Sequence, residues 1–172
     1  RPTFVSLVDE SGDGADVIRK LNNHKVNTDY IWKTRDGMGT WLAVFDNEGD
    51  VAASISKRPD LMPIADILEE QGDEIIRNAD SVMIEIDVDK EIVKRTFRLA
   101  KKYGKKVYAV VANMNIALER RDFLQSIDCF VCNVQEAGIL FADDYGAFTP
   151  AEMEKTLLSK VKAAQIPSMI VT

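Results

Sequence analysis

Residues 81–171 alternate between short apolar runs and segments with helical periodicity. The apolar runs cover residues 81–86, 106–112, 129–132 and 168–171. Helical patterns separate them at residues 90–103, within 116–126, at 134–141 and from Pro150 onward, where Thr149 and Glu152 have the spacing of a capping box. Strands and helices in this order and spacing predict parallel βαβ units, whose sheet is covered on both faces. We therefore predict an α/β fold: a doubly wound, mainly parallel sheet with helices on both faces.

Residues 1–78 follow a less regular pattern. A strand is predicted at residues 4–8, a Gly/Asp-rich turn at 9–14 and a helix at 15–23. Two β-rich runs, 40–45 and 51–55, are joined by Asp46-Asn-Glu-Gly-Asp50, which is typical of a hairpin. Because no helix separates these runs, we predict that residues 29–56 form a small antiparallel sheet. A further helix is predicted at residues 64–78, with a break at Gly72.

Composition restricts the class of protein and its partners. The chain has 172 residues, of which 46% are hydrophobic, enough for one packed core but too short for two ordinary domains. Its formal net charge of -6 argues against a nucleic-acid partner, because phosphate neutralisation needs a basic surface. The small basic clusters at residues 101–106 and at Arg120-Arg121 are predicted to be solvated. No apolar run is as long as a membrane span, so no membrane partner is expected.

Cys129 and Cys132 have the spacing of many redox and metal motifs, but a simpler interpretation is favoured. Residues three apart on a strand point to opposite faces, so the two thiols are expected to diverge. No second cysteine pair is present, and His24 is the only histidine. We therefore expect small buried residues rather than a zinc site. Two cysteines in a chain of this size also suggest the reducing cytoplasm as its location.

Asn133 and Glu136 lie where a predicted buried strand ends and a predicted helix begins. In open α/β sheets, ligands bind in the crevice at the carboxyl ends of the strands, and a helix start offers free N–H groups to a phosphate. The same spacing is that of a capping box, in which each side chain satisfies a backbone N–H of its own helix. The sequence leaves both interpretations open.

Taken in order, several stretches resemble the ribokinase-like (PfkB) family of carbohydrate and nucleoside kinases, and within it most closely the pseudouridine-kinase-like branch. The matching stretches are residues 4–8, 26–31, 37–46, 79–87, 113–118 and 132–137. The similarity extends over essentially the whole chain. Its one recognised family motif is the N-x-x-E of Asn133 and Glu136, and the order and spacing of the stretches carry the rest.

This resemblance implies a fold, a reaction and a set of site residues. Residues 29–56 would form a β-hairpin lid on an incomplete α/β core made of residues 1–28 and 57–172. The reaction would transfer the γ-phosphoryl group of ATP to a hydroxymethyl group of a small-molecule sugar or nucleoside, with Mg²⁺. Asn133 and Glu136 would lie beside the nucleotide phosphates, with Glu136 contacting the metal through water. The residues implied in substrate binding are Asp87, Glu85, Thr40 and Asn113.

Local structural roles compete with these functional ones. Asp87 and Asp89 could cap the helix that follows them, and Asn113 and Asn115 could satisfy a turn after their strand. Trp41 and Phe45, in the implied lid, could be packing residues of the hairpin. For each residue the sequence alone leaves the alternative open.

The chain also departs from the family pattern. The family's Gly-Ala-Gly-Asp motif, which supplies an anion hole and an aspartate base, is absent, as are an upstream glycine pair and an asparagine that bind the sugar. We therefore expect the central portion of a longer kinase, inactive by itself. Missing strands would leave apolar sheet surface uncovered, so self-association is expected. The alternative from another class is a non-catalytic α/β ligand-binding or interaction domain.

Overall fold

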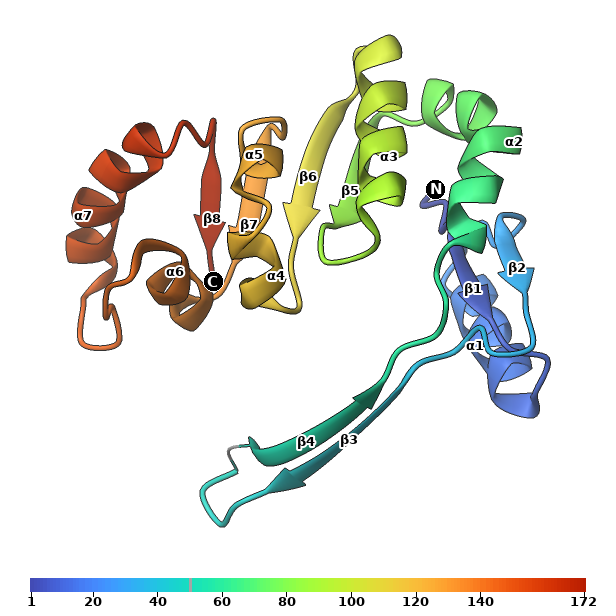
Figure 1. Cartoon of the computed structure of the whole chain (residues 1–172), viewed down its shortest axis with the longest axis horizontal. Helices are drawn as coiled ribbons and strands as arrows, with labels where there is room; N and C mark the ends of the chain where they lie inside the picture. Colours follow the sequence, from blue (N-terminus) through green and yellow to red (C-terminus); the bar gives the residue numbers. More distant parts are fainter. Residues whose placement is uncertain (50) are drawn as a thin grey trace. The chain divides into compact units, whose positions relative to one another are not determined.

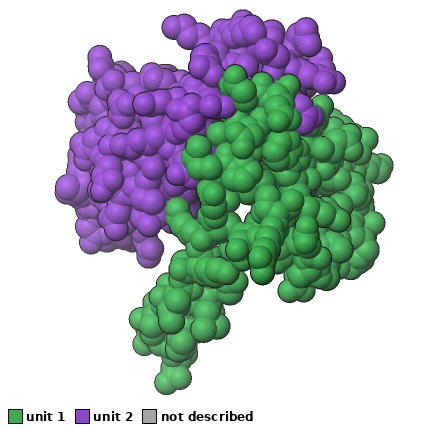
Figure 2. Space-filling model, turned by 45° about the vertical axis from the view of Figure 1, so that its right-hand side comes forward, with its two compact units in different colours: residues 1–70 green, residues 71–172 purple. Residues whose placement is uncertain are grey.

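The computed structural model describes residues 1–49 and 51–172, without the side chain of residue 117 (Figure 1). The chain divides into two compact units, Arg1–Glu70 and Gln71–Thr172 (Figure 2). Asp50, at the end of the predicted hairpin turn, lies outside the described residues. Each hydrogen-bonded sheet falls within one of the two units.

The first unit begins with a small βαβ arrangement. β1 (Ser6–Val8) pairs in parallel with β2 (Ile31–Lys33), and α1 (Gly12–Asn23) connects them. The helix starts earlier than predicted because the Ser11 hydroxyl accepts hydrogen bonds from the N–H groups of Asp13 and Gly14. The prediction of an antiparallel sheet throughout residues 29–56 was wrong for residues 31–33. A helical crossover returns the chain beside β1 in the parallel direction.

The predicted hairpin is confirmed. β3 (Thr40–Phe45) and β4 (Val51–Lys57) pair antiparallel, with an irregularity between Val44 and Phe45. Directly opposed residues of an antiparallel pair share a face. One face therefore carries Leu42, Val44 and Ile55, and the other carries Trp41, Phe45 and Val51; all six side chains are largely exposed. A two-stranded ribbon with apolar side chains on both faces is only marginally stable alone.

α2 (Pro63–Arg77) is continuous, so the predicted break at Gly72 was wrong. Gly72 is buried within the helix, and Leu68, Ile75 and Ile76 are buried on either side of it. A glycine inside a helix costs about 1 kcal/mol relative to alanine, which burial of the neighbouring apolar side chains offsets. The helix pattern was therefore the stronger signal.

The second unit contains the predicted parallel sheet, and the α/β fold class is confirmed. The strands lie in the order β5 (Ser81–Glu85), β6 (Lys106–Val110), β7 (Cys129–Cys132) and β8 (Met169–Val171). Its helices are α3 (Lys90–Lys102), α4 (Met114–Leu118), α5 (Arg121–Leu124), α6 (Val134–Phe141) and α7 (Pro150–Ala163). Every paired strand in this sheet runs parallel to its neighbour.

The core of this unit lies between one face of the sheet and the helices. Ile84, Ala109, Phe130 and Cys132 on the strands share a buried cluster with helix residues such as Leu140. On the opposite face, Met83 is 69% exposed and Ile170 is 50% exposed. Cys129 and Cys132 are both buried and free, as expected for small core residues.

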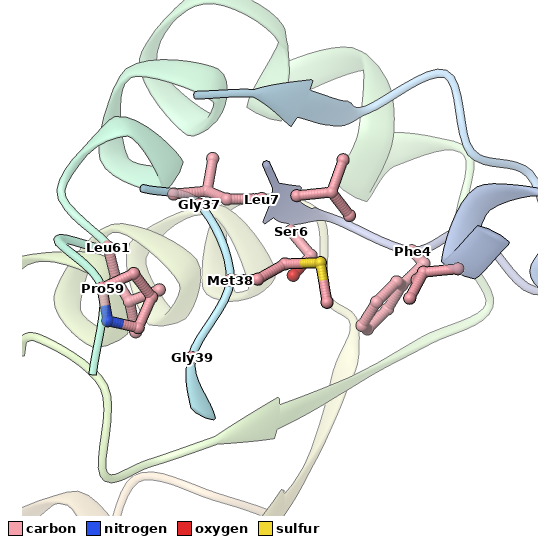
Figure 3. Close-up of a pocket in the computed structure, with 10 residues that line it drawn as sticks. Phe4, Ser6, Leu7, Gly37, Met38, Gly39, Pro59 and Leu61 are labelled. Atoms are coloured by element: carbon pink, nitrogen blue, oxygen red, sulfur yellow. The ribbon is translucent and has the colours of Figure 1, made fainter. Parts of the chain in front are cut away.

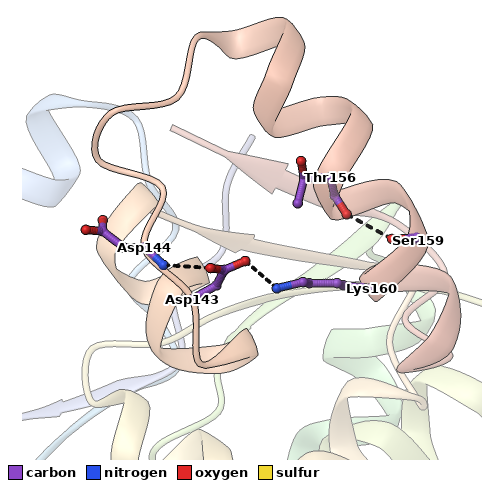
Figure 4. A network of polar contacts seen from close by, with 5 residues as sticks. All are labelled: Asp143, Asp144, Thr156, Ser159 and Lys160. Atoms are coloured by element: carbon purple, nitrogen blue, oxygen red, sulfur yellow. Dashed lines mark hydrogen bonds and ion pairs between the residues drawn. The ribbon is translucent and has the colours of Figure 1, made fainter.

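Helix α7 is anchored at its start and at the preceding loop. Thr149 and Glu152 form the predicted capping box, with Glu152 Oε2 accepting the Thr149 N–H at 2.9 Å. Lys160 forms an ion pair with Asp143 in the loop after α6 (Figure 4). This contact raises the pKa of Lys160 and lowers that of Asp143. None of the helices in the described ranges is long and apolar enough to cross a membrane.

Candidate functional site at the carboxyl edge of the parallel sheet

The carboxyl ends of β5, β6 and β7 gather most of the predicted site residues. Glu85 is the last residue of β5, and it pairs in register with Val110, the last residue of β6. Asn113 follows β6 by three residues, and Asn133 comes directly after β7. Because the strands are parallel, all these positions lie on one edge of the sheet, where ligands bind in open α/β folds.

Glu85 connects the ends of the first two strands. Its Oε1 accepts hydrogen bonds from the N–H of Ala112 at 3.2 Å and from the N–H of Asp87 at 3.4 Å. Partial burial, followed by the nearby charge of Asp87, raises the pKa of Glu85 to about 7. Near neutral pH this carboxyl group exists in both protonation states, so it can accept or donate a hydrogen bond.

Asp87 lies two residues beyond β5 and is only 6% exposed. Asp89 occupies the N-cap position of α3 and makes no side-chain capping bond, so the capping interpretation is wrong for Asp89. A buried carboxylate at the edge of a sheet is uncommon unless it has partners or a binding role. Asp87 does interact with the rest of the protein, so its burial is at least partly compensated.

Asn113 serves a local turn. Its Oδ1 accepts a hydrogen bond from the N–H of Asn115 at 3.1 Å, at the start of α4. This contact is the local role that the sequence allowed. The half-buried Asn113 side chain still stands on the same edge as Glu85.

Asn133 and Glu136 form a complete capping box at the start of α6. The N–H of Glu136 donates to Asn133 Oδ1, and the N–H of Asn133 donates to Glu136 Oε2, each at 2.8 Å. In the described part of the chain, Asn133 Nδ2 and Glu136 Oε1 have no protein partner. A remaining carboxylate oxygen fits Mg²⁺, which prefers oxygen ligands and retains several waters. The local role is therefore present, and it leaves atoms for a ligand.

Comparisons with known proteins show what the chain is similar to in sequence and in fold. No family model matches the chain. In sequence it is 33% identical over 138 residues to the guanosine-inosine kinase of Exiguobacterium acetylicum, a match covering 80% of this chain and 46% of that protein. The chain is a relative of the ribokinase-like (PfkB) kinases.

Solved structures agree on the ribokinase-like fold. Arabidopsis thaliana ribokinase, complexed with ribose and ATP, matches with a TM-score of 0.73 and 20% identity over 99% of this chain and 55% of its own. The 2-dehydro-3-deoxygluconokinase of Thermotoga maritima matches with a TM-score of 0.77 and 13% identity over 98% of this chain and 56% of its own. The chain spans about half the length of these relatives.

The last predicted site residue, Thr40, lies in the first unit, at the start of β3. Thr40 is exposed and pairs with Lys57 of β4. Trp41, its neighbour, is 60% exposed, and Phe45 is also exposed. Phe45 is directly opposed to Val51 and Trp41 to Ser56, so the interpretation of these two aromatic residues as packing residues of the hairpin stays a prediction.

The first unit also contains an apolar pocket of about 300 Å³ (Figure 3). Its walls come from β1, from the segment after β2 and from the segment before α2. The labelled lining residues are Phe4, Ser6, Leu7, Gly37, Met38, Gly39, Pro59 and Leu61. Few polar groups line this pocket, so it does not resemble a site for a polyhydroxylated or phosphorylated ligand.

The sequence did not predict the role of Arg120 beside the sheet edge. Arg120 and Arg121 were predicted to be solvated; this is confirmed for Arg121, which is exposed, and wrong for Arg120, which is partly buried. Arg120 Nη1 donates to the carbonyl oxygens of Ile86 and Val88, and Arg121 Nη2 donates to that of Leu140. These bonds span 34, 32 and 19 residues, so no local pattern in the sequence could have indicated them. Among the described residues, no group of three or more metal-binding side chains is present.

Proposed function

We propose that the intact protein transfers the γ-phosphoryl group of ATP to a hydroxymethyl group of a small sugar or nucleoside, using Mg²⁺. The observation that carries this proposal is the edge of the parallel sheet where polar residues stand at the ends of three adjacent strands: Glu85 and Asp87 at β5, Asn113 after β6, and Asn133 and Glu136 after β7. The sequence likeness to a nucleoside kinase supports the same chemistry. Phosphoryl transfer depends mainly on positioning and charge neutralisation, which such an edge can provide.

In this proposal the polar residues have separate roles. Asp87 and Glu85 accept hydrogen bonds from substrate hydroxyl groups, and Asn113 and Thr40 contribute further substrate contacts. Asn133 lies beside the nucleotide phosphates, where the positive end of the α6 dipole also favours anions. Glu136 contacts Mg²⁺ through water, which suits an ion that keeps much of its hydration shell.

In this proposal the segment of residues 29–56 supplies the lid through the β3–β4 hairpin, with residues 1–28 and 57–172 forming the core. Its exposed apolar residues would lose water on closing over a bound substrate. Exclusion of water protects the transferred phosphoryl group from hydrolysis. The same exposed residues also support self-association, and we propose that the protein forms a homo-oligomer. We further propose that it is located in the cytoplasm.

The isolated chain of 172 residues is proposed to be inactive, because it contains no Gly-Ala-Gly-Asp sequence. Without that motif it has neither the family's aspartate base nor its anion hole. The carboxylates that it does contain are proposed to bind and orient ligands. The complete protein and the isolated chain are therefore expected to differ in catalysis.

The test compares two proteins: the product of the complete reading frame and the isolated chain. Each is incubated with Mg²⁺ and ATP and with a panel of acceptors that includes ribose, guanosine and inosine. ADP release and the mass of the product are measured. Phosphorylation of at least one acceptor by the complete protein alone is the expected result. Ligand-induced thermal stabilisation without any ADP release would instead support a non-catalytic binding domain.

A further inference from the structure

The segment after β5, residues 86–89, is held by hydrogen bonds from several directions. The N–H of Ile86 donates to the Val110 carbonyl at 3.1 Å, which continues the ladder to β6. The N–H of Asp87 donates to Glu85 Oε1 at 3.4 Å. The carbonyl of Ile86 accepts from Arg120 Nη1 at 2.8 Å. The peptide unit that joins residues 86 and 87 is therefore held at both its oxygen and its nitrogen.

Arg120 also holds the far side of Asp87. The same Nη1 atom donates to the carbonyl of Val88, so one nitrogen contacts the carbonyl on each side of Asp87. The chain turns at residues 86–88 directly after β5, and the carbonyl groups of Ile86 and Val88 both lie within reach of this one donor. The backbone rotation at Asp87 is thus set by a side chain more than thirty residues away.

Arg120 does not have the surroundings of an ordinary surface cation. It occupies the N-cap position of the short helix α5, and its side chain is partly buried. Its Nε atom is buried and has no hydrogen-bond partner among the described residues. A buried donor without a partner is unfavourable, so the hydrogen bonds of Nη1 are what hold this side chain in place. The position of the Nη1 atom between two carbonyls is its distinguishing feature.

We propose that Arg120 is a positioning residue, which fixes the loop around Asp87 so that the Asp87 carboxylate is aligned for the phosphoryl acceptor. This inference rests on the proposed function, because it takes the acceptor to be the ligand of Asp87. Arg120 itself does not contact the reacting atoms. A carboxylate on a loosely held loop would spend less time in the orientation that binds a hydroxyl group.

The test uses three variants in the product of the complete reading frame. Arg120→Met removes the donors and keeps most of the apolar stem, whereas Arg120→Lys restores a charged donor. Arg121→Met is the matched control, because among the described residues Arg121 donates to the Leu140 carbonyl and not to residues 86–89. For Arg120→Met we expect KM for the acceptor to rise about tenfold or more, with KM for ATP within about twofold. Arg120→Lys is expected to raise the acceptor KM less than Arg120→Met does. Arg121→Met is expected to leave the acceptor KM unchanged.

Hydrogen exchange measured by mass spectrometry provides a readout that does not need activity. In Arg120→Met, peptides containing residues 86–89 are expected to exchange about tenfold faster, while peptides from α7 are unchanged. Equal exchange in the wild type and in Arg120→Met would overturn the proposal, as would an unchanged acceptor KM. A lower Tm with an unchanged acceptor KM would also contradict the proposal, because it would show that Arg120 has a purely structural role. A wild-type protein that phosphorylates no acceptor would refute the proposed function, and the exchange data would still decide whether Arg120 holds the loop.

Discussion

Asn133 and Glu136 exchange reciprocal hydrogen bonds at the start of α6, each 2.8 Å long. The capping role and the proposed nucleotide role thus fall on the same pair of side chains. The two roles need different properties, because a cap requires a hydrogen-bond acceptor and metal-bound water favours a charge. Substitutions that separate acceptor from charge can therefore distinguish them.

Glu136→Gln keeps an oxygen that can cap the Asn133 N–H and removes the negative charge. We expect the free energy of unfolding to change by less than about 0.5 kcal/mol and kcat to fall at least about tenfold. Chemical denaturation and steady-state kinetics on the complete protein measure the two quantities. Glu152→Gln in the capping box of α7 is the control, since it makes the same change away from the sheet edge. If both variants keep full activity, Glu136 only caps its helix.

Asn133→Ala removes the acceptor for the Glu136 N–H. We expect the free energy of unfolding to fall by about 1 kcal/mol, which is typical for loss of an N-cap side chain. Asn133→Asp should retain most of that stability, because aspartate also caps well. Urea denaturation of the three proteins provides the comparison. Equal stability of Asn133→Ala and the wild type would mean that the capping box contributes nothing to the fold.

Glu85 predicts a pH dependence of stability with a definite sign. Its pKa is raised from 4.5 to about 7 in the folded protein. Between these values the folded state binds a proton that the unfolded chain has lost, so this group makes the free energy of unfolding fall as pH rises through the window. Glu85→Gln removes this contribution, and its stability relative to the wild type should therefore increase from pH 4.5 to pH 7. Urea denaturation at several pH values measures the difference. A constant difference would contradict the raised pKa.

The aliphatic face of the β3–β4 hairpin is the expected site of self-association. Leu42 and Ile55, which pair across this face, are 62% and 73% exposed. On the opposite face Trp41 is paired with Ser56 and Ala43 with Ser54. Ile55→Lys should shift sedimentation towards monomers at a given concentration, because it places a charge in an apolar contact. Ser56→Lys, on the other face, is the control. A monomeric wild type would contradict the prediction.

Cys132 is expected to be unreactive in the folded protein. Burial, and to a lesser extent the Glu136 charge, raises its pKa to about 12, so almost no thiolate forms near pH 8. Iodoacetamide treatment with peptide mapping should show labelling of Cys132 only after denaturant is added. Rapid labelling in native buffer would mean that the end of β7 opens readily.

The sequence predicted those features that depend on neighbouring residues. The capping boxes at Asn133 and Thr149 were predicted because their partners lie three residues away. The strands at residues 81–85 and 129–132 were predicted because short runs of apolar residues indicate buried strands. The hairpin between β3 and β4 followed from its turn residues in the same way.

Tertiary structure decided what depends on distant residues. The pairing of β2 with β1, the bond from Ala112 to Glu85 and the contacts of Arg120 with the loop around Asp87 each join segments far apart in the chain. Local periodicity indicates which face of an element is apolar, but it does not indicate which distant carbonyl a given guanidinium meets. The amino-acid sequence by itself therefore determined the elements and the residue types at their ends. Only the folded arrangement determined that Glu85 would be half-buried between two strand ends and that Arg120 would hold the backbone beside Asp87, because both depend on long-range hydrogen bonds.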